Sequence, residues 1–584
     1  MSFAPYSALL LAALGLPLGL AALWNLRALR PFVGSITPWA PLPALTLAFS
    51  APHDAAVHLD WLLLGTSLGL TGITRVFLLF TAVLWLGAGI HARGYLQKDP
   101  ARSRFELLWL LTFAGNLLLI LALDVVSFYA GFALMTFAAY GLVVHTGKAV
   151  VRRAGRVYLT MAVLGEGLIL AGILLIAGEA ATPLFPEIAE IPTVVADSPR
   201  RDLLIGLIFF GFGVKAGLPL LHLWLPLAHP VAPVPASAVL SGAMIKAGLL
   251  AWLHFLPIGL ISLPGWSAFA IGAGLIAAFG AAFIGLHQQQ PKTVLAYSSV
   301  SQMGLITIGV GMMLQAPDLR PLLVGAIAVY ALHHALAKGA LFLGVAVARH
   351  PGVHVSPLLW VLLALPALAL TGVLTSGVVA KMGLKAALEM PVDFPAWWHY
   401  LPSLLGLAAV GTTLVLARYL WLMRKESQGD RAPRSVWIGW AVVLAAGPVL
   451  VFLPEHWGVA ERVYPEATDW VNLGWPVLVG TALALIGIRW LRPWPIPPGD
   501  MLALITLHPK TIQRIRVGAN HATHGLHRQM KRARIVMIRP RYRLLPRDRV
   551  WRREASLLFA LLLLLLLAAG LLDTLPCRDG ACFP

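Results

Sequence analysis

Apolar runs of about 20 residues follow one another along nearly the whole chain, and they constrain its fold more than any other feature. A run of this length can cross the hydrocarbon core of a bilayer as a helix. Only 12% of the 584 residues are charged and 59% are hydrophobic, which excludes a soluble domain with a single anchor. We therefore expect an all-α, polytopic membrane protein with about sixteen transmembrane helices. Their centres lie near Leu14, Leu45, Leu84, Leu117, Leu134, Leu170, Ile208, Leu249, Leu275, Ile306, Ile327, Leu365, Leu407, Val443, Leu483 and Leu564.

The charges between these runs alternate, and the alternation predicts how the chain is oriented. Cytoplasmic loops carry an excess of Lys and Arg. Every second loop is basic, with Arg27, Arg30, Arg93, Lys98, Arg102, Arg104, Lys148, Arg152, Arg153, Arg156, Lys292, Arg349, Arg418, Arg424, Lys425, Arg431 and Arg434. The intervening loops are acidic, with Glu179, Glu187, Glu190, Asp197, Glu389, Asp393, Glu455, Glu461, Glu466 and Asp469. Sixteen spans with both termini outside satisfy this pattern. The first run has no basic segment before it and no clear cleavage site after it, so we expect it to be retained as an anchor.

A basic segment separates the last two runs. Its cations are concentrated between residues 514 and 553, and apolar residues are interspersed among them. We interpret residues 491–553 as cytoplasmic, with short amphipathic pieces that bind anionic lipid or a partner. A solvated basic linker is the alternative. The net charge of +19 is concentrated in this segment and in the loops, so we expect no nucleic acid partner. Cys577 and Cys582 follow the last span on the outside, where a disulfide is chemically permitted.

The sequence predicts no cofactor and no metal. Two cysteines are too few for an iron–sulfur cluster, and no cysteine and histidine cluster indicates a zinc site. No glycine-rich phosphate loop follows a strand pattern. We expect no catalytic or redox centre on this chain, which leaves open whether it belongs to an oxidoreductase that pumps protons.

A lysine and two prolines interrupt the run near Ile208. The segment from Lys215 to Pro226 reads KAGLPLLHLWLP, with Pro219 four residues and His222 seven residues after the lysine. A lysine at bilayer depth is costly and usually faces a bundle interior or water. Proline frees backbone groups, as in the broken helices of transporters. We expect a helix broken at Pro219 and Pro226, a proton-storing amine at Lys215 and a place for His222 in the proton relay. The alternative is a lysine permanently paired with a carboxylate.

Further ionisable residues lie inside the next runs. Lys246 is at the centre of its run, too deep for a side chain that reaches the interface, and we interpret it as a relay residue. His334 and Lys338 are four residues apart on one helical face, and histidine titrates near neutrality. We expect a proton relay there, and the alternative is a polar pair that packs helices. A metal site is disfavoured because His333 and His334 face different ways.

A second broken helix is expected at Pro366, and Lys381 follows it as the candidate for the last relay site. Lys385 is equally consistent with an interfacial anchor. Glu166 lies inside an earlier run and is able to balance the charge of Lys215 or Lys246. Weaker candidates, all close to the ends of runs, are His254, His287 and Asp124.

The two broken helices suggest an internal repeat. Residues 105–257 and 258–424 each contain five runs, and the fourth run of each is broken, near Lys215 and near Lys381. Five is an odd number, so the second half has inverted topology, as in many ion-coupled transporters. The remaining segments are N-terminal helices at 1–104, C-terminal helices at 425–490, the basic segment at 491–553, and the last span with its tail at 554–584.

These residues resemble the antiporter-like subunit family of respiratory complex I, Mrp-type cation/proton antiporters and membrane-bound hydrogenases such as hydrogenase-4 and formate hydrogenlyase. The resemblance covers residues 71–424. The family pattern of a lysine leading into PLHxWLP and then APxPxSAxxSGxxxKxG is found from Lys215 to Gly248. The segment His334–Phe342 matches HxxxKxxLF, and Gly377–Lys381 corresponds to the GFxxK element, with Val378 at the phenylalanine position. The Ser-Gly before Lys381 and the segment Pro497–Asp500 are most similar to Mrp D-type and hydrogenase-4 B-type subunits.

One departure from the family concerns the partner of Lys215. The family usually has a glutamate in its fifth helix, in a WELM-like sequence, and Ala133 stands at that position here. Thr71 replaces an early aspartate. Lys215 therefore lacks the neighbour that the resemblance implies. Either Glu166 or a partner subunit supplies a substitute, or the coupling is altered or lost.

The resemblance implies a proton-translocating, or cation/proton-translocating, subunit of a multi-subunit respiratory, hydrogenase or antiporter complex. Its partners would be other membrane subunits, in the inner (plasma) membrane of a prokaryote. Protons would pass from Lys215 through Lys246, His334 and Lys338 to Lys381. One alternative is a proton-coupled partner that energises a solute or inorganic-carbon uptake complex. The other is a non-conducting scaffold, which Ala133 favours.

Overall fold

A computed structural model describes residues 5–490 and 496, apart from 53–54, 181–185, 351–356, 375, 391–394, 428–430 and 462. The described residues all belong to one compact unit. Apart from residue 496, the basic segment at 491–553 lies outside the described residues. The span near Leu564 and the cysteines Cys577 and Cys582 also lie outside them.

Helices make up nearly all of the described chain, and thirteen helical segments in it are long and apolar enough to cross a membrane. The helices are α1 (Pro5–Leu23), α2 (Arg30–Ile36), α3 (Leu42–Ser50), α4 (Gly72–Tyr95), α5 (Arg102–Leu121), α6 (Val125–Val143), α7 (Ala149–Glu179), α8 (Ile191–Asp197), α9 (Arg201–Ala216), α10 (Trp224–Val231), α11 (Val234–Val239), α12 (Ile245–Phe255), α13 (Pro264–Leu286), α14 (Pro291–Gln315), α15 (Arg320–Arg349), α16 (Pro357–Thr371), α17 (Ser376–Leu388), α18 (Leu401–Glu426), α19 (Arg434–Leu450), α20 (Leu453–His456) and α21 (Ala467–Trp490). A π-helical turn, η3 (Leu240–Met244), joins α11 to α12, and 3-10 turns are η1 (Arg27–Leu29), η2 (Thr37–Trp39), η4 (Pro317–Leu319) and η5 (Ala396–Tyr400).

The all-α, polytopic fold predicted from the apolar runs is confirmed. Fifteen of the sixteen predicted centres fall inside described helices, and the sixteenth, Leu564, lies outside the described residues. The weak second run is divided between α2 and α3, which the turn η2 joins. The helices α9 and α19, with 16 and 17 residues, are shorter than all thirteen of these segments, the shortest of which has 18.

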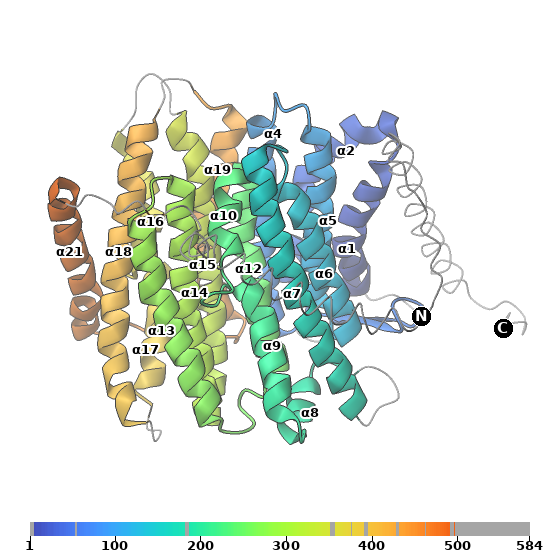
Figure 1. Ribbon diagram of the computed structural model, residues 1–584. Coiled ribbons are helices and arrows are strands. Elements are labelled where there is room, and N and C mark those ends of the chain that lie inside the picture. Colours follow the sequence, from blue (N-terminus) through green and yellow to red (C-terminus); the bar gives the residue numbers. More distant parts are fainter. Residues whose placement is uncertain are drawn as a thin grey trace, which may run out of the picture. The chain divides into compact units, whose positions relative to one another are not determined.

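Two long helices form the centre of the bundle. The apolar segments of α14 and α15 are entirely buried, whereas that of α21 is only 17% buried. In Figure 1 the long helices lie side by side, with α1 against α5 and with α21 on the outer side of α18. Because both faces of α14 and α15 contact protein, their polar side chains meet other side chains rather than lipid.

A short β-hairpin, which was not among the predicted elements, interrupts the helices. The strands β1 (Ala56–Leu59) and β2 (Thr66–Gly69) pair antiparallel, with Ala56 opposite Gly69. Asp124, the N-cap residue of α6, accepts hydrogen bonds from the backbone N–H groups of Ser127 (2.7 Å) and Ser67 (2.9 Å). The Asp124 side chain thus satisfies one backbone N–H group at the start of α6 and one in the hairpin.

The first break separates α9 from α10. Gly217 ends α9 in the left-handed conformation, with a φ of +85°, which glycine adopts without steric cost. Pro219 lies inside the break, as predicted. Pro226 does not, because the chain is already helical from Trp224 and Pro226 is the third residue of α10. Proline is tolerated in a first helical turn because its missing N–H needs no partner there.

The second break separates α16 from α17, and its position differs from the prediction. Pro366 lies inside α16, which continues for five more residues to Thr371. The chain turns instead at Gly372, whose φ is +96°, and becomes helical again at Ser376. A left-handed glycine therefore ends the helix, and the proline does not.

The two predicted halves share the order of their elements. In each half the first two helices cross at glycines: a Cβ added at Gly115 would lie 2.8 Å from the Gly131 carbonyl oxygen, and one at Gly274 would lie 2.6 Å from that of Gly304. Such small residues let helix backbones approach closely in membranes. The inverted relation of the halves and the segment boundaries stay predictions.

Candidate functional site

Lys215 lies in the last turn of α9, at the first break, and is 5% exposed. Its amine donates a hydrogen bond to the Tyr158 hydroxyl (3.4 Å), which in turn donates one to the Thr136 carbonyl (2.9 Å). The amine also lies 5.8, 5.4 and 5.5 Å from the ring centroids of Phe132, Tyr158 and Trp224. Aromatic faces attract a cation, so these three rings form a cage that stabilises the protonated amine.

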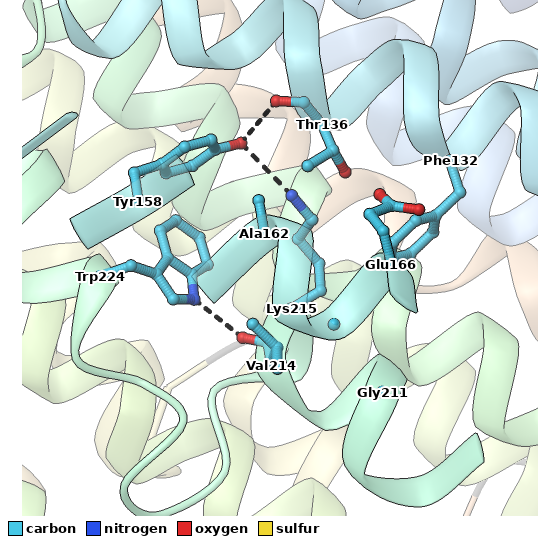
Figure 2. A pocket seen from close by; sticks show the side chains of 10 residues that line it. Phe132, Thr136, Tyr158, Ala162, Glu166, Gly211, Val214, Lys215 and Trp224 are labelled. Atoms are coloured by element: carbon cyan, nitrogen blue, oxygen red, sulfur yellow. Dashed lines mark hydrogen bonds between the residues drawn. The ribbon is translucent and has the colours of Figure 1, made fainter. Parts of the chain in front are cut away.

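Glu166 of α7 shares a small cavity with Lys215. The cavity has a volume of about 20 Å³, room for about one water molecule. Figure 2 shows the Lys215 amine between the Tyr158 hydroxyl and the Glu166 carboxylate. The carboxylate is buried, and neither of its oxygens makes a hydrogen bond among the described residues. It interacts electrostatically with Lys215. Ala133 is half-buried and does not line this cavity.

Lys246 lies immediately after the π-helical turn η3 and is completely buried. Its amine donates a hydrogen bond to the Ser241 carbonyl oxygen (2.8 Å), five residues earlier. A π-turn shifts the backbone hydrogen bonds by one residue, and such turns are frequent at functional sites. The sequence placed Lys246 correctly inside its span, but its pattern gave no sign of the turn.

A hydrogen-bonded route leads from Lys246 to Lys338 of α15. The Ser241 hydroxyl lies 2.7 Å from that of Ser299 on α14. Ser299 donates to the Leu295 carbonyl oxygen (2.9 Å), which also accepts from the Lys338 amine (3.2 Å). Lys338 is completely buried. Three helical segments thus meet at one polar route inside the bundle.

The two adjacent histidines of α15 have different surroundings. Neither ring nitrogen of His334 has a hydrogen-bond partner among the described residues, although the side chain is completely buried. It lies within electrostatic range of Lys246 and Lys338. His333 forms a 2.8 Å hydrogen bond with the Ser376 hydroxyl at the start of α17, and it lies within electrostatic range of Lys381. The structure therefore brings Lys246, His334 and Lys338 together. His333 connects this group to the second break through its hydrogen bond with Ser376.

Lys381 lies in α17, after the second break, and is half-buried. Its amine donates a hydrogen bond to the Thr371 carbonyl, the last residue of α16. Its stem lies against Gly372. Lys215, in contrast, precedes its own break. The two lysines thus mark opposite sides of their interruptions.

His222 lies between the two halves of the first broken helix. It is buried, its Nδ1 is 3.3 Å from the Leu218 carbonyl oxygen, and its Nε2 has no hydrogen-bond partner among the described residues. No hydrogen bond or ion pair among the described residues links Lys215 to Lys246. A proton that moved between these two amines would need a route through water.

Two further buried residues, a lysine and a histidine, were not among the predicted relay residues. Lys292, assigned to a cytoplasmic loop, is buried in the first turn of α14 and donates to the Ala232 carbonyl (2.5 Å). His229 of α10 is completely buried, stacks on Phe342 at 4.6 Å, and lies within electrostatic range of Lys292 and Lys338. His229 could have been recognised as a histidine in an apolar stretch. Lys292 lies at the end of an apolar run, where a basic loop residue is expected.

The weaker candidates have local roles. Asp124 caps α6, which agrees with its interpretation as the marker of a span end. His254 is half-buried beside Phe128, with ring centroids 6.3 Å apart. His287 ends α13 and contacts the Phe283 carbonyl oxygen at 2.8 Å. Among the described residues, no group of three His, Cys, Asp or Glu is arranged to hold a metal ion.

A helical bundle with two interrupted spans and several buried amines defines a multi-pass membrane protein with the broken helices typical of transporters. Residues 122–360 match the family described as "NADH:quinone oxidoreductase/Mrp antiporter, TM". The central part of the chain, from the residues just before α6 to the start of α16, is therefore similar to the antiporter-like membrane subunit family.

Named relatives agree with this family. Hydrogenase-4 component B of Escherichia coli is 33% identical over 279 residues, which are 46% of this chain and 40% of that protein. NADH-quinone oxidoreductase subunit N of Heliobacterium modesticaldum is 28% identical over 361 residues, 59% of this chain and 73% of that protein. A chain in the solved Mrp complex of a Dietzia species has the same fold, with a TM-score of 0.69 at 21% identity. That match covers 98% of this chain but 64% of the Mrp chain, and the chain spans only 40% of the length of hydrogenase-4 component B.

Proposed function

We propose that the chain is a proton-translocating membrane subunit of a larger complex in the inner (plasma) membrane of a prokaryote. Protons would pass between Lys215, Lys246, the pair of His334 and Lys338, and Lys381. Other membrane subunits would be its partners, and they or a counter-ion gradient would supply the energy. Anionic lipid would contact the basic segment at 514–553.

One observation carries this proposal: the central lysines are buried without a counter-charge among the described residues. Lys246 and Lys338 are completely buried, and each donates a hydrogen bond to a backbone carbonyl. No carboxylate pairs with either amine among the described residues. A permanent charge in such a place is expensive, whereas an amine that is neutral part of the time avoids the cost. An amine able to gain and lose a proton is what a relay needs.

The arrangement of the halves supports the same function. We infer that residues 105–257 and 258–424 are inverted repeats, each with its broken helix beside one end of the relay. Broken helices of this kind line the ion sites of transporters. In this proposal each half provides access from one side of the membrane, and the hydrogen-bonded residues of α12, α14 and α15 join the halves.

The names of the relatives favour translocation within a complex, since they describe hydrogenase, quinone oxidoreductase and Mrp proteins. The scaffold alternative depended on Ala133 and the missing glutamate. Glu166 lies in the cavity of Lys215 and offers a carboxylate from α7 instead. That observation favours conduction over a scaffold.

Proton flux through the native complex tests the proposal. The complex is purified through a tag on this chain, reconstituted in liposomes, and exposed to a valinomycin-clamped potassium diffusion potential with a pH dye inside. We expect Lys246→Ala and Lys338→Ala each to remove most of the flux. Lys425→Ala is the matched control, because Lys425 is exposed on α18 and packs on Trp421.

Flux that stayed at the parent level in both buried-lysine variants, in complexes of normal composition, would refute the relay. Parent complexes without any flux above empty liposomes would support the scaffold. Co-purification of a solute-binding or carbon-uptake subunit would favour the other alternative.

A further inference from the structure

Lys385 lies one helical turn beyond Lys381 in α17, so the two side chains share one face of the helix. Lys385 forms an ion pair with Asp469 of α21 and another with Glu389, at 3.0 Å. The lysine side chain is 35% exposed and that of Glu389 is 61% exposed. Lys385 therefore stands between the half-buried Lys381 and a carboxylate in contact with solvent.

Asp469 accepts hydrogen bonds through both of its carboxylate oxygens in this cluster. Its side chain is 4% exposed, and its second oxygen accepts a hydrogen bond from the Glu466 backbone N–H (2.9 Å). It lies in the first turn of α21, where the helix dipole favours a negative charge. The helix α21 packs against α18, where a Cβ at Gly406 would lie 2.8 Å from the Trp475 ring. A buried carboxylate on a helix that is otherwise largely exposed needs a specific reason.

The cluster also lies on one predicted side of the membrane. Glu389 follows α17 and Glu466 precedes α21, and both belong to the acidic loops that the charge pattern places outside. The other lysines of the proposed relay lie deeper or toward the first half. The Lys385 end of the proposed relay therefore lies on the side of the membrane where a translocated proton would be released.

We propose that Lys385 is the outlet of the proton path and that Asp469 positions it. This inference rests on the proposed function and extends it to residues outside the central relay. Lys385 releases its proton to Glu389 or to outside water, and the neutral amine then accepts a proton from the Lys381 ammonium, directly or through water. One proton leaves the cluster for each proton that enters it. Asp469 keeps the Lys385 amine in place between release and recharging.

Lys385→Arg separates this role from a structural one. Arginine keeps the charge and the ion pairs, but a guanidinium holds its proton roughly 100-fold more tightly than an amine. We expect proton flux to fall about tenfold or more, with the composition and thermal stability of the complex unchanged. Lys425→Arg, the same exchange at an exposed site of α18, should leave flux unchanged. Asp469→Asn should lower flux because Lys385 loses its anchor.

Chemical rescue tests the role without depending on how arginine fits. Lys385→Cys should lose flux and regain it after aminoethylation, which restores a titratable amine. A methanethiosulfonate that adds a quaternary ammonium should not restore it, because that charge has no proton to release. The parent complex treated with the same reagents controls for modification of Cys577 and Cys582.

The outcomes distinguish this inference from the proposed function. Normal flux in Lys385→Arg, with flux lost in Lys246→Ala, would overturn the outlet and leave the relay intact. Rescue of Lys385→Cys by the quaternary ammonium would also overturn it, since a fixed charge would then suffice. Normal flux in all of these variants would overturn both.

Discussion

The hydroxyl oxygens of Ser241 and Ser299 lie 2.7 Å apart in the middle of the bundle and join two buried lysines that do not touch each other. Lys246 is bonded to the Ser241 backbone, and Lys338 shares the Leu295 carbonyl with Ser299. The amines end on carbonyl oxygens, which do not carry protons onward. The hydroxyl groups of Ser241 and Ser299 are the only hydroxyl groups on this route. Water would have to connect them to the two amines to complete a path for protons.

The first prediction concerns this serine pair. Ser299→Ala removes the bond to Ser241 and the bond to the Leu295 carbonyl. We expect proton flux to fall about fivefold, which corresponds to about 1 kcal/mol for a hydrogen bond. Flux is measured in liposomes under a potassium diffusion potential.

Ser298→Ala is the matched control. Ser298 is the preceding residue of α14, is equally buried, and its hydroxyl has no hydrogen-bond partner among the described residues. Its flux should equal that of the parent. Equal losses in the two variants would show that the serine pair has no special part in the path.

The second prediction concerns Gly372, the left-handed residue of the second break. A Cβ at this position would overlap the stem and amine of Lys381. Gly372→Ala should therefore displace the amine from the Thr371 carbonyl and greatly reduce flux. It should also lower the free energy of unfolding by about 1 kcal/mol or more, because alanine is strained at positive φ.

Gly458→Ala separates strain from displacement. Gly458 also has a positive φ, of +66°, but no atom lies within 4 Å of a Cβ built there. This variant should lose some thermal stability and keep its flux. If Gly372→Ala kept its flux as well, the position of the Lys381 amine beside the break would not matter.

The sequence predicted the spans and the buried amines well, for a clear physical reason. Lipid requires long apolar runs, so the centres of fifteen helices were visible without any tertiary information. A lysine in such a run is conspicuous because it is costly there. Lys215, Lys246 and Lys338 are therefore all buried where the pattern placed them.

The breaks and turns within the helices were predicted less accurately than the spans themselves. Pro366 looked like a helix break, yet a bundle interior can satisfy the backbone group that a proline frees, and α16 continues through it. The break depends on Gly372, one glycine among 54. The π-turn before Lys246 and the burial of Lys292 depend on packing between helices distant in sequence, which no run of residues displays.

The third prediction concerns Glu166 as the substitute for the missing carboxylate of α6. Glu166→Gln keeps the shape of the side chain in the Lys215 cavity and removes its charge. An opposite charge near a buried amine is worth at least about 1.4 kcal/mol, so flux should fall roughly tenfold. Glu190→Gln, at an exposed residue, is the control and should have no effect.

A second-site change makes the test of Glu166 specific. Phe132 and Thr136, on either side of position 133 in α6, line the cavity of Lys215. Ala133→Glu in the Glu166→Gln background would return a carboxylate to this region from the other helix, and part of the flux should recover. Glu166→Gln alone with parent flux would show that the aromatic cage of Phe132, Tyr158 and Trp224 suffices for Lys215. Loss of flux in Glu166→Gln without recovery in the double variant would show that the carboxylate must come from α7. A carboxylate at position 133 of α6 would then not reach the Lys215 amine in a geometry that supports proton transfer.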